Sequence, residues 1–158
     1  ELMRRIRRYN RTAEVIECAH KPLYLQNVFT GEQLPLEALR DAFIGSLCAI
    51  AAPESFEGAL AKLGAHVDLA KSYIDHHYYT EAELISFINR CIRRDLAMIV
   101  TTEKDSVRMP RLPDADLKVP IYFLRVEIDI LSGHESWEHC VARICKPKPV
   151  LPPERFFA

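Results

Sequence analysis

Two histidines stand side by side in residues 74–80, IDHHYYT, behind an aspartate and ahead of a helix start. Asp75, His76 and His77 are residue types that bind metal ions, transfer protons, or form hydrogen bonds where a strand meets a helix. Each interpretation requires different companions elsewhere in the chain. The segment itself leaves all three open.

A metal site would need further ligands, because adjacent residues of an irregular loop point in different directions and supply about two. The chain offers few candidates: His66 and Asp68 lie on the preceding predicted strand, and His134 and His139 lie on or beside the last predicted helix. The cysteines form no CxxC pair. We therefore expect this chain to hold no metal ion.

A second polar cluster, VTTEKD, ends the predicted strand at residues 96–102. Thr102, Glu103, Lys104 and Asp105 are suited to binding a polar ligand at the carboxyl end of that strand. The same threonine and aspartate oxygens also suit a cap on the turn that follows. Both interpretations remain open from the residues alone.

Several enzyme classes lack their signature in the sequence. It contains five glycines and no GxxxxGK[ST] or GxGxxG motif, so a complete kinase or ATPase is not present. No GxSxG motif supports Ser-His-Asp nucleophile chemistry. The net charge of -1 gives no overall reason to expect a nucleic-acid partner. Five arginines within residues 4–11 would suit a membrane surface or a phosphate-rich ligand, and equally a solvated helix face.

Composition indicates an ordinary globular domain, with 158 residues of which 49% are apolar and 27% charged. Five cysteines, an odd number lying mostly in apolar patterns, predict reduced thiols in a cytoplasmic compartment. No apolar run approaches the roughly 20 residues that a membrane span needs, and no signal peptide is visible. The chain begins at Glu1 rather than at a methionine, which leads us to expect a piece of a longer protein.

Hydrophobic periodicity predicts alternating strands and helices. Strands are expected at 13–28, 43–51, 65–74, 96–102 and 119–130, and helices at 36–42, 53–64, 80–95 and 135–145, with a turn at 30–35. Thr80 and Glu83 stand in capping-box spacing at the third helix. This order predicts an α/β fold, a largely parallel sheet with helices on its faces. The loops after residues 51, 74 and 102 should then meet at the carboxyl edge of the sheet.

Three segments in this order resemble the C-terminal lobe of the tetraacyldisaccharide 4'-kinase family: CAIAAPESFEGALAKLG, YIDHHYYTEAEL and IVTTEKDSVRM. The resemblance covers residues 43–109 well. One departure is Ala49, where the family usually has glycine in a GIA strand end. The resemblance divides the chain into hinge strands and a short helix at 1–42, an α/β lobe at 43–145, and a proline-rich tail at 146–158.

The resemblance implies ATP- and magnesium-dependent transfer of the γ-phosphate to the 4'-hydroxyl of a tetraacyldisaccharide 1-phosphate, in lipid A biosynthesis. ATP and Mg²⁺ would be bound mainly by an N-terminal P-loop lobe, so this chain alone is expected to be inactive. The implied partners are that lobe, the lipid-linked substrate and a membrane surface, with no nucleic acid. The implied location is peripheral or monotopic, at the cytoplasmic face of the inner membrane.

Carried onto these residues, the family pattern makes His76 the partner of an aspartate of the P-loop lobe in a catalytic dyad, with Asp75 beside it. His77 is less constrained, since a tyrosine can stand there in the family. Thr102, Glu103, Lys104 and Asp105 would form a motif that faces the cleft. The unperturbed pKa of a histidine is about 6.5, so a nearby carboxylate readily changes its charge state at neutral pH.

Two other functions share parts of this pattern. A manganese-dependent phosphoesterase of the Asp-His-His class has the same three letters, but it needs several further aspartates, and no DxD occurs upstream of Asp75. A non-catalytic module would use the same loops only to recognise a phosphorylated ligand. Metal analysis tests the first alternative, and the upstream coding sequence tests the second.

Overall fold

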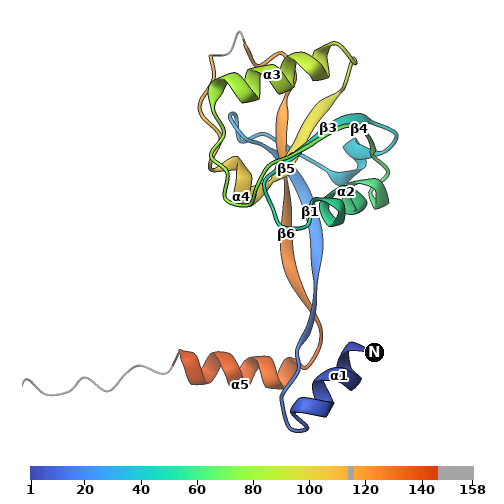
Figure 1. Ribbon diagram of the computed structural model, residues 1–158, viewed down its shortest axis with the longest axis vertical. Coiled ribbons are helices and arrows are strands. Elements are labelled where there is room, and N and C mark those ends of the chain that lie inside the picture. Colours follow the sequence, from blue (N-terminus) through green and yellow to red (C-terminus); the bar gives the residue numbers. More distant parts are fainter. Residues whose placement is uncertain (114–115, 146–158) are drawn as a thin grey trace, which may run out of the picture. The chain divides into compact units, whose positions relative to one another are not determined.

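The computed structural model of the chain describes residues 1–113 and 116–145 (Figure 1). The proline-rich tail predicted at 146–158 lies outside the described residues. Two compact units are present. One consists of residues 1–20 together with the chain from Ile128 onward, and the other is Lys21–Glu127.

The core element is a six-stranded sheet with the order β2-β1-β6-β5-β3-β4. Its strands are β1 (Glu17–Asn27), β2 (Gln33–Leu34), β3 (Phe43–Cys48), β4 (His66–Ser72), β5 (Met98–Thr102) and β6 (Ile121–Ser132). The pairs β3–β4, β3–β5 and β5–β6 are parallel, whereas β1 and β2 form an antiparallel pair. The predicted α/β class with a largely parallel sheet is confirmed.

The helices are α1 (Leu2–Tyr9), η1 (Leu36–Leu39), α2 (Pro53–Lys62), α3 (Glu81–Ile92), α4 (Glu103–Ser106) and α5 (His134–Ile144). Helix α1 lies outside the helix ranges expected from the sequence, and three shorter elements also differ from those expectations. The helix expected at 36–42 is a single 3₁₀ turn, part of the turn expected at 30–35 pairs as strand β2, and α4 forms where no helix was predicted. All three are short elements, whose formation depends on tertiary contacts more than on periodicity.

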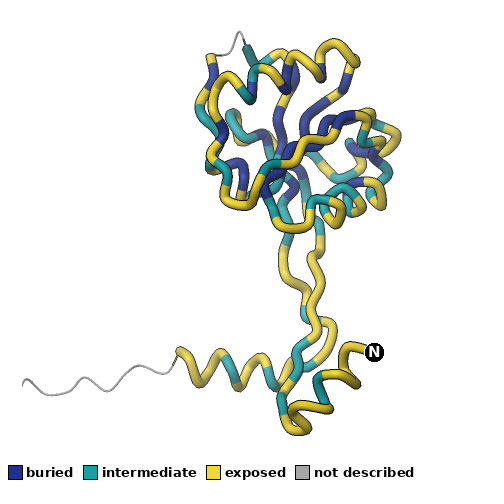
Figure 2. Tube along the Cα trace, in the orientation of Figure 1, coloured by how far each residue is buried: buried dark blue, intermediate teal, exposed yellow. Residues whose placement is uncertain are grey.

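Two apolar clusters hold the second unit together, one on each face of the sheet. The buried stretches of the chain lie in this unit (Figure 2). Leu84, Phe87, Ile88 and Cys91 of α3 pack against one face, where Leu47 is the contribution of β3. Leu60 of α2 and Leu39 of η1 pack against the other face, where Ile44 is the contribution of β3. Burial on both faces explains why β3 reads as an almost continuous apolar run.

The first unit has much less buried surface. Neither α1 nor α5 contains a buried residue. Trp137, Val141 and Ile144 stand at helical spacing on α5 and are 47%, 37% and 74% exposed. No helix among the described residues has the length and apolar character needed to cross a bilayer.

Gly45 of β3 faces α3 at close range, and this contact gives a test of the packing. A Cβ at this position would lie 2.8 Å from Cys91 Sγ and 3.2 Å from Phe87 Cε1. Gly45→Ala should therefore lower the free energy of unfolding by about 1–3 kcal/mol through overpacking. Urea titration followed by circular dichroism measures the change.

Gly58→Ala is the matched control, because a Cβ at this exposed position on α2 meets nothing within 4 Å. It should raise the free energy of unfolding by roughly 0.5–1 kcal/mol, since glycine is the poorer helix former. Equal effects of the two substitutions would contradict the packing described between β3 and α3.

Candidate functional site

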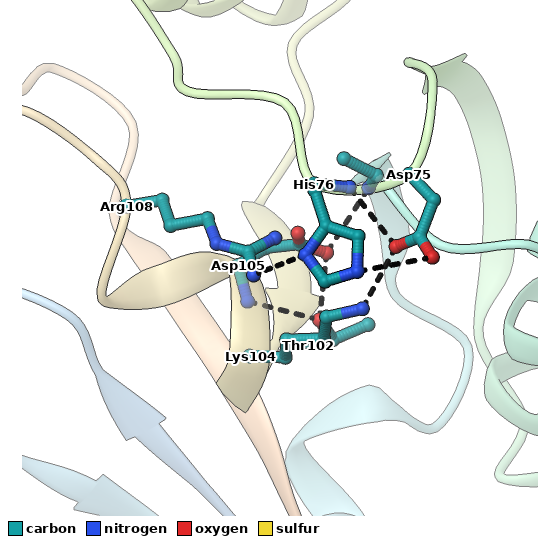
Figure 3. Close-up of polar contacts among 7 residues, drawn as sticks. Asp75, His76, Thr102, Lys104, Asp105 and Arg108 are labelled. Carbon is teal, nitrogen blue, oxygen red and sulfur yellow. Dashed lines mark hydrogen bonds and ion pairs between the residues drawn. The ribbon is translucent and has the colours of Figure 1, made fainter.

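Three loops meet at the carboxyl edge of β3, β4 and β5, as the strand order predicts (Figure 3). The loop after β3 contributes the backbone of Ala49, and the loop after β4 contributes Asp75 and His76. The segment after β5 contributes Thr102, Lys104, Asp105 and Arg108. Direct hydrogen bonds join the third segment to each of the other two.

Asp105 is the buried anchor of this arrangement, with no exposed surface. Its Oδ2 accepts hydrogen bonds from the Ala49 backbone N–H at 3.0 Å and from the Thr102 hydroxyl at 2.6 Å. The backbone N–H of Asp105 donates in turn to Thr102 Oγ1 at 3.2 Å, which caps α4. The structure thus places the Asp105 side chain inside the fold, where it holds two loops together.

Ala49 occupies the position where the resembling family usually has glycine. Its side chain is fully buried. Among the described non-glycine residues, the left-handed region is adopted by Asp41, His76 and Asp95, so Ala49 lies outside it. An alanine therefore fits here without backbone strain. The contact that matters at this position is made by the main-chain N–H, which any residue except proline provides.

Asp75 and His76 form the exposed part of the cluster. Asp75 Oδ1 accepts hydrogen bonds from Lys104 Nζ at 2.7 Å and from the His76 backbone N–H at 3.0 Å. The hydrogen bond from Lys104 is the main cause that lowers the pKa of the Asp75 carboxyl below its usual range. Asp75 is therefore ionised at neutral pH and held in one orientation.

His76 adopts a left-handed backbone conformation with φ of 68°, and its side chain is 69% exposed. Its Nδ1 lies 3.0 Å from Nη2 of Arg108, and its Nε2 lies 3.6 Å from Oδ2 of Asp75. Positive φ is uncommon for non-glycine residues, among which asparagine, aspartate and histidine adopt it most often, and it clusters at functional sites. His76 is thus a strained, accessible imidazole with a cation at one ring nitrogen.

His77 lies in a different environment from its neighbour. Its ring stacks on Tyr73 with a centroid distance of 4.2 Å and meets Tyr79 edge-on at 5.3 Å. Its Nε2 lies 3.1 Å from Oε2 of Glu83 on α3. The packing makes His77 part of the junction between the loop and α3.

The junction continues into the cap of α3. Glu83 Oε2 accepts from the backbone N–H of Thr80 at 2.8 Å and from its hydroxyl at 2.8 Å, and the Glu83 N–H donates back to Thr80 Oγ1. This reciprocal pair is the predicted capping box. Burial raises the pKa of the neighbouring Tyr79 phenol far above its usual value, so that hydroxyl stays protonated at neutral pH.

Glu103, the remaining residue of the predicted VTTEKD cluster, forms an ion pair with Arg125 of β6.

Arg108 was not predicted as a site residue from the sequence. It lies within the quoted segment IVTTEKDSVRM, but a lone arginine after a short helix gives no signal of its own. Among residues 1–113 and 116–145, no group of three or more histidine, cysteine, aspartate or glutamate side chains could hold a metal ion.

The capping box gives a pH-dependent prediction. The Thr80 backbone hydrogen bond, followed by the Thr80 hydroxyl, lowers the pKa of Glu83. A lowered pKa stabilises the fold above the unfolded-state value, about 4.3, and this contribution is lost as the pH falls through the folded value. Glu83→Gln should therefore unfold at lower urea than wild type at pH 7, and the gap should shrink below about pH 4.

Glu81→Gln is the control for this prediction. Glu81 lies in the same first turn and feels the same helix dipole, but it takes no part in the capping box. Its urea midpoint at pH 7 should therefore fall by less than that of Glu83→Gln, because only the interaction with the dipole is lost. A gap for Glu83→Gln that is constant between pH 7 and pH 3.5 would refute the ionised capping box.

A family model described as tetraacyldisaccharide-1-P 4'-kinase matches residues 3–146. A tetraacyldisaccharide 4'-kinase from Anaeromyxobacter sp. (strain K) is 32% identical over 151 residues, which are 94% of this chain and 40% of that protein. The protein of the same name from Syntrophus aciditrophicus (strain SB) is 33% identical over 137 residues, covering 86% of this chain and 36% of the relative.

A solved structure of LpxK from Aquifex aeolicus, described as an "apo" form in complex with ATP, has a TM-score of 0.47 and 18% identity. It matches 82% of this chain and 36% of that one. This chain thus spans about two fifths of the length of the curated relatives it matches.

Proposed function

This chain belongs to the tetraacyldisaccharide-1-P 4'-kinase family, and we propose that it is the C-terminal lobe of an ATP-dependent kinase of lipid A biosynthesis. The proposed reaction transfers the γ-phosphate of ATP to the 4'-hydroxyl of a tetraacyldisaccharide 1-phosphate. The observation that carries the proposal is the family match over residues 3–146. The kinase names of the relatives do not favour an Asp-His-His phosphoesterase.

The residues of this chain do not form a binding site for the phosphates of a nucleoside triphosphate. Gly31, Gly64 and Gly133 adopt positive φ, but they lie at three separate turns, and the sequence has no GxxxxGK[ST] motif. We therefore assign ATP and Mg²⁺ to the remaining three fifths of the relatives' length, in an N-terminal P-loop lobe. The proposed contribution of this chain to the active site is the carboxyl edge of its sheet, where the loop after β4 contains His76.

His76 is the residue proposed to act in the reaction. Phosphoryl transfer depends mainly on positioning and charge stabilisation, with a base that orients the attacking hydroxyl. The exposure of His76 and the hydrogen bonds that Lys104 and Arg108 make to its loop support the proposal that it orients a carboxylate base of another lobe. His77 is occupied by Tyr73 and Glu83, which supports a structural role for it.

The proposed location is the cytoplasmic face of the inner membrane, with peripheral or monotopic attachment. Helix α1, whose sequence is LMRRIRRY, supports this through its arginines, which would be attracted to anionic lipid headgroups. The lipid-linked substrate and the N-terminal lobe are the remaining proposed partners. No nucleic-acid partner is proposed.

The isolated 158-residue chain should neither hydrolyse ATP nor bind it in the micromolar range, because it has no cradle for the β- and γ-phosphates. Titration calorimetry with Mg-ATP measures this directly. In the coding sequence upstream of Glu1, a GxxxxGK[ST] motif should be found. Micromolar binding by this chain, or an upstream sequence without that motif, would overturn the proposed division between lobes.

In the complete kinase, His76→Ala should lower kcat by roughly 10²–10⁴-fold, the usual range for a positioned acid–base group. KM for ATP should change little. Phosphorylation of a tetraacyldisaccharide 1-phosphate with labelled ATP provides the assay.

His77→Ala is the control, and it should lower thermal stability more than turnover, since its contacts are those of the junction with α3. Near-normal kcat for His76→Ala, or a loss explained by unfolding of that variant, would make His76 a structural residue.

A further inference from the structure

The hydrogen bond between Arg108 and His76 carries chemical information about the imidazole. Arg108 Nη2 lies 3.0 Å from His76 Nδ1. An arginine guanidinium has five N–H donors and no acceptor, and it stays protonated in proteins. Arg108 must therefore be the donor, so Nδ1 of His76 must be the acceptor and carry no proton.

A neutral imidazole has one protonated and one unprotonated ring nitrogen, so the acceptor role of Nδ1 assigns the proton to Nε2. The hydrogen bond made by one ring nitrogen commonly decides the state of the other in this way. Nε2 lies 3.6 Å from Oδ2 of Asp75, beyond hydrogen-bond range. The Nε2–H therefore stays available to an acceptor outside this chain.

Arg108 is itself held in place by the buried part of the site. Its backbone N–H donates to the Asp105 carbonyl at 2.9 Å, which ties it to the anchor residue. Its Nη1 is buried and has no hydrogen-bond partner among the described residues, and its guanidinium carbon lies 5.9 Å from the ring centroid of Tyr78. The hydrogen bond that the structure gives to this guanidinium is the one to His76.

The left-handed conformation of His76 fits the same arrangement. A φ of 68° is unfavourable for a residue with a side chain, and a glycine would adopt it without strain. The residue at this position is nevertheless a histidine, with Arg108 as the donor at its Nδ1 and the Asp75 carboxylate near its Nε2.

We propose that Arg108 is a positioning residue, which fixes His76 in the Nε2–H tautomer so that Nε2 donates to the carboxylate base of the kinase reaction. The involvement of a carboxylate base rests on the proposed function, whereas the tautomer rests on this chain alone. Lys104 plays a similar part for Asp75, because it donates to Oδ1 of that carboxylate at 2.7 Å.

The tautomer is measured by nitrogen-15 NMR of the histidine rings in the 158-residue chain, at a pH where they are neutral. The His76 signals are assigned by their loss in His76→Ala. In the wild type, Nε2 should have the chemical shift of a protonated nitrogen and Nδ1 that of an acceptor. In Arg108→Met, both shifts should move toward intermediate values as the Nδ1–H tautomer becomes populated, and Arg108→Lys should restore part of the wild-type pattern.

Arg93→Gln is the matched control, because Arg93 is an exposed arginine at the end of α3 and belongs to neither loop. It should leave the His76 shifts unchanged. A wild-type His76 with the proton on Nδ1, or equal tautomer populations in wild type and Arg108→Met, would overturn the proposal. The backbone amide spectrum of each variant verifies its fold, so a shift caused by unfolding is recognised.

The kinetic arm uses the complete kinase. Arg108→Met should lower kcat by about 10-fold, the lower end of the cost of removing an outer group that orients a functional side chain. KM for ATP should stay unchanged, and Arg108→Lys should recover part of the activity. A tautomer change without loss of kcat would refute the role of Arg108 in the reaction. If His76→Ala also kept full activity, the proposed function of His76 would fail as well.

Discussion

The buried carboxylate of Asp105 is the interaction on which the rest of the site depends. It binds the Ala49 N–H and the Thr102 hydroxyl with one oxygen, and so joins the loop after β3 to the first turn of α4. A buried acceptor that loses its donors costs about 1–3 kcal/mol, so these loops have little freedom to separate. Lys104 and Arg108, which bind the exposed Asp75 and His76, belong to the segment that Asp105 anchors.

Adjacent residues in the loop after β4 have separate tasks because the backbone changes direction at His76. With φ of 68°, the chain sends the His76 ring toward Arg108, while the His77 ring packs on Tyr73 and reaches Glu83. The interior histidine stabilises the start of α3, and the exterior one remains accessible.

The sequence was sufficient for features that depend on local pattern. The capping box of Thr80 and Glu83 and the parallel sheet follow from residue spacing, and the structure contains both. The convergence of the three loops also followed, since the carboxyl ends of parallel strands share one edge.

What the sequence could not supply were contacts between distant residues. Asp105 looked like one polar residue among several, and only the packing of β3 beside β5 reveals that its partner is Ala49. Arg108 hydrogen-bonds to His76, which lies 32 positions earlier in the sequence. The short elements β2 and α4 are likewise formed by their surroundings, because two to four residues have no periodicity to read.

The division of the chain into two units determines the order in which they can form. Lys21–Glu127 is continuous in sequence, and its ends are joined by an ion pair between Lys21 and Glu127 at 3.0 Å. The other unit is discontinuous, because its first part precedes residue 21 and its second part follows residue 127. On a ribosome, the site-bearing unit has all its residues before the second half of the other has been synthesised. The three loops can therefore assemble before the last residues of the discontinuous unit have been synthesised.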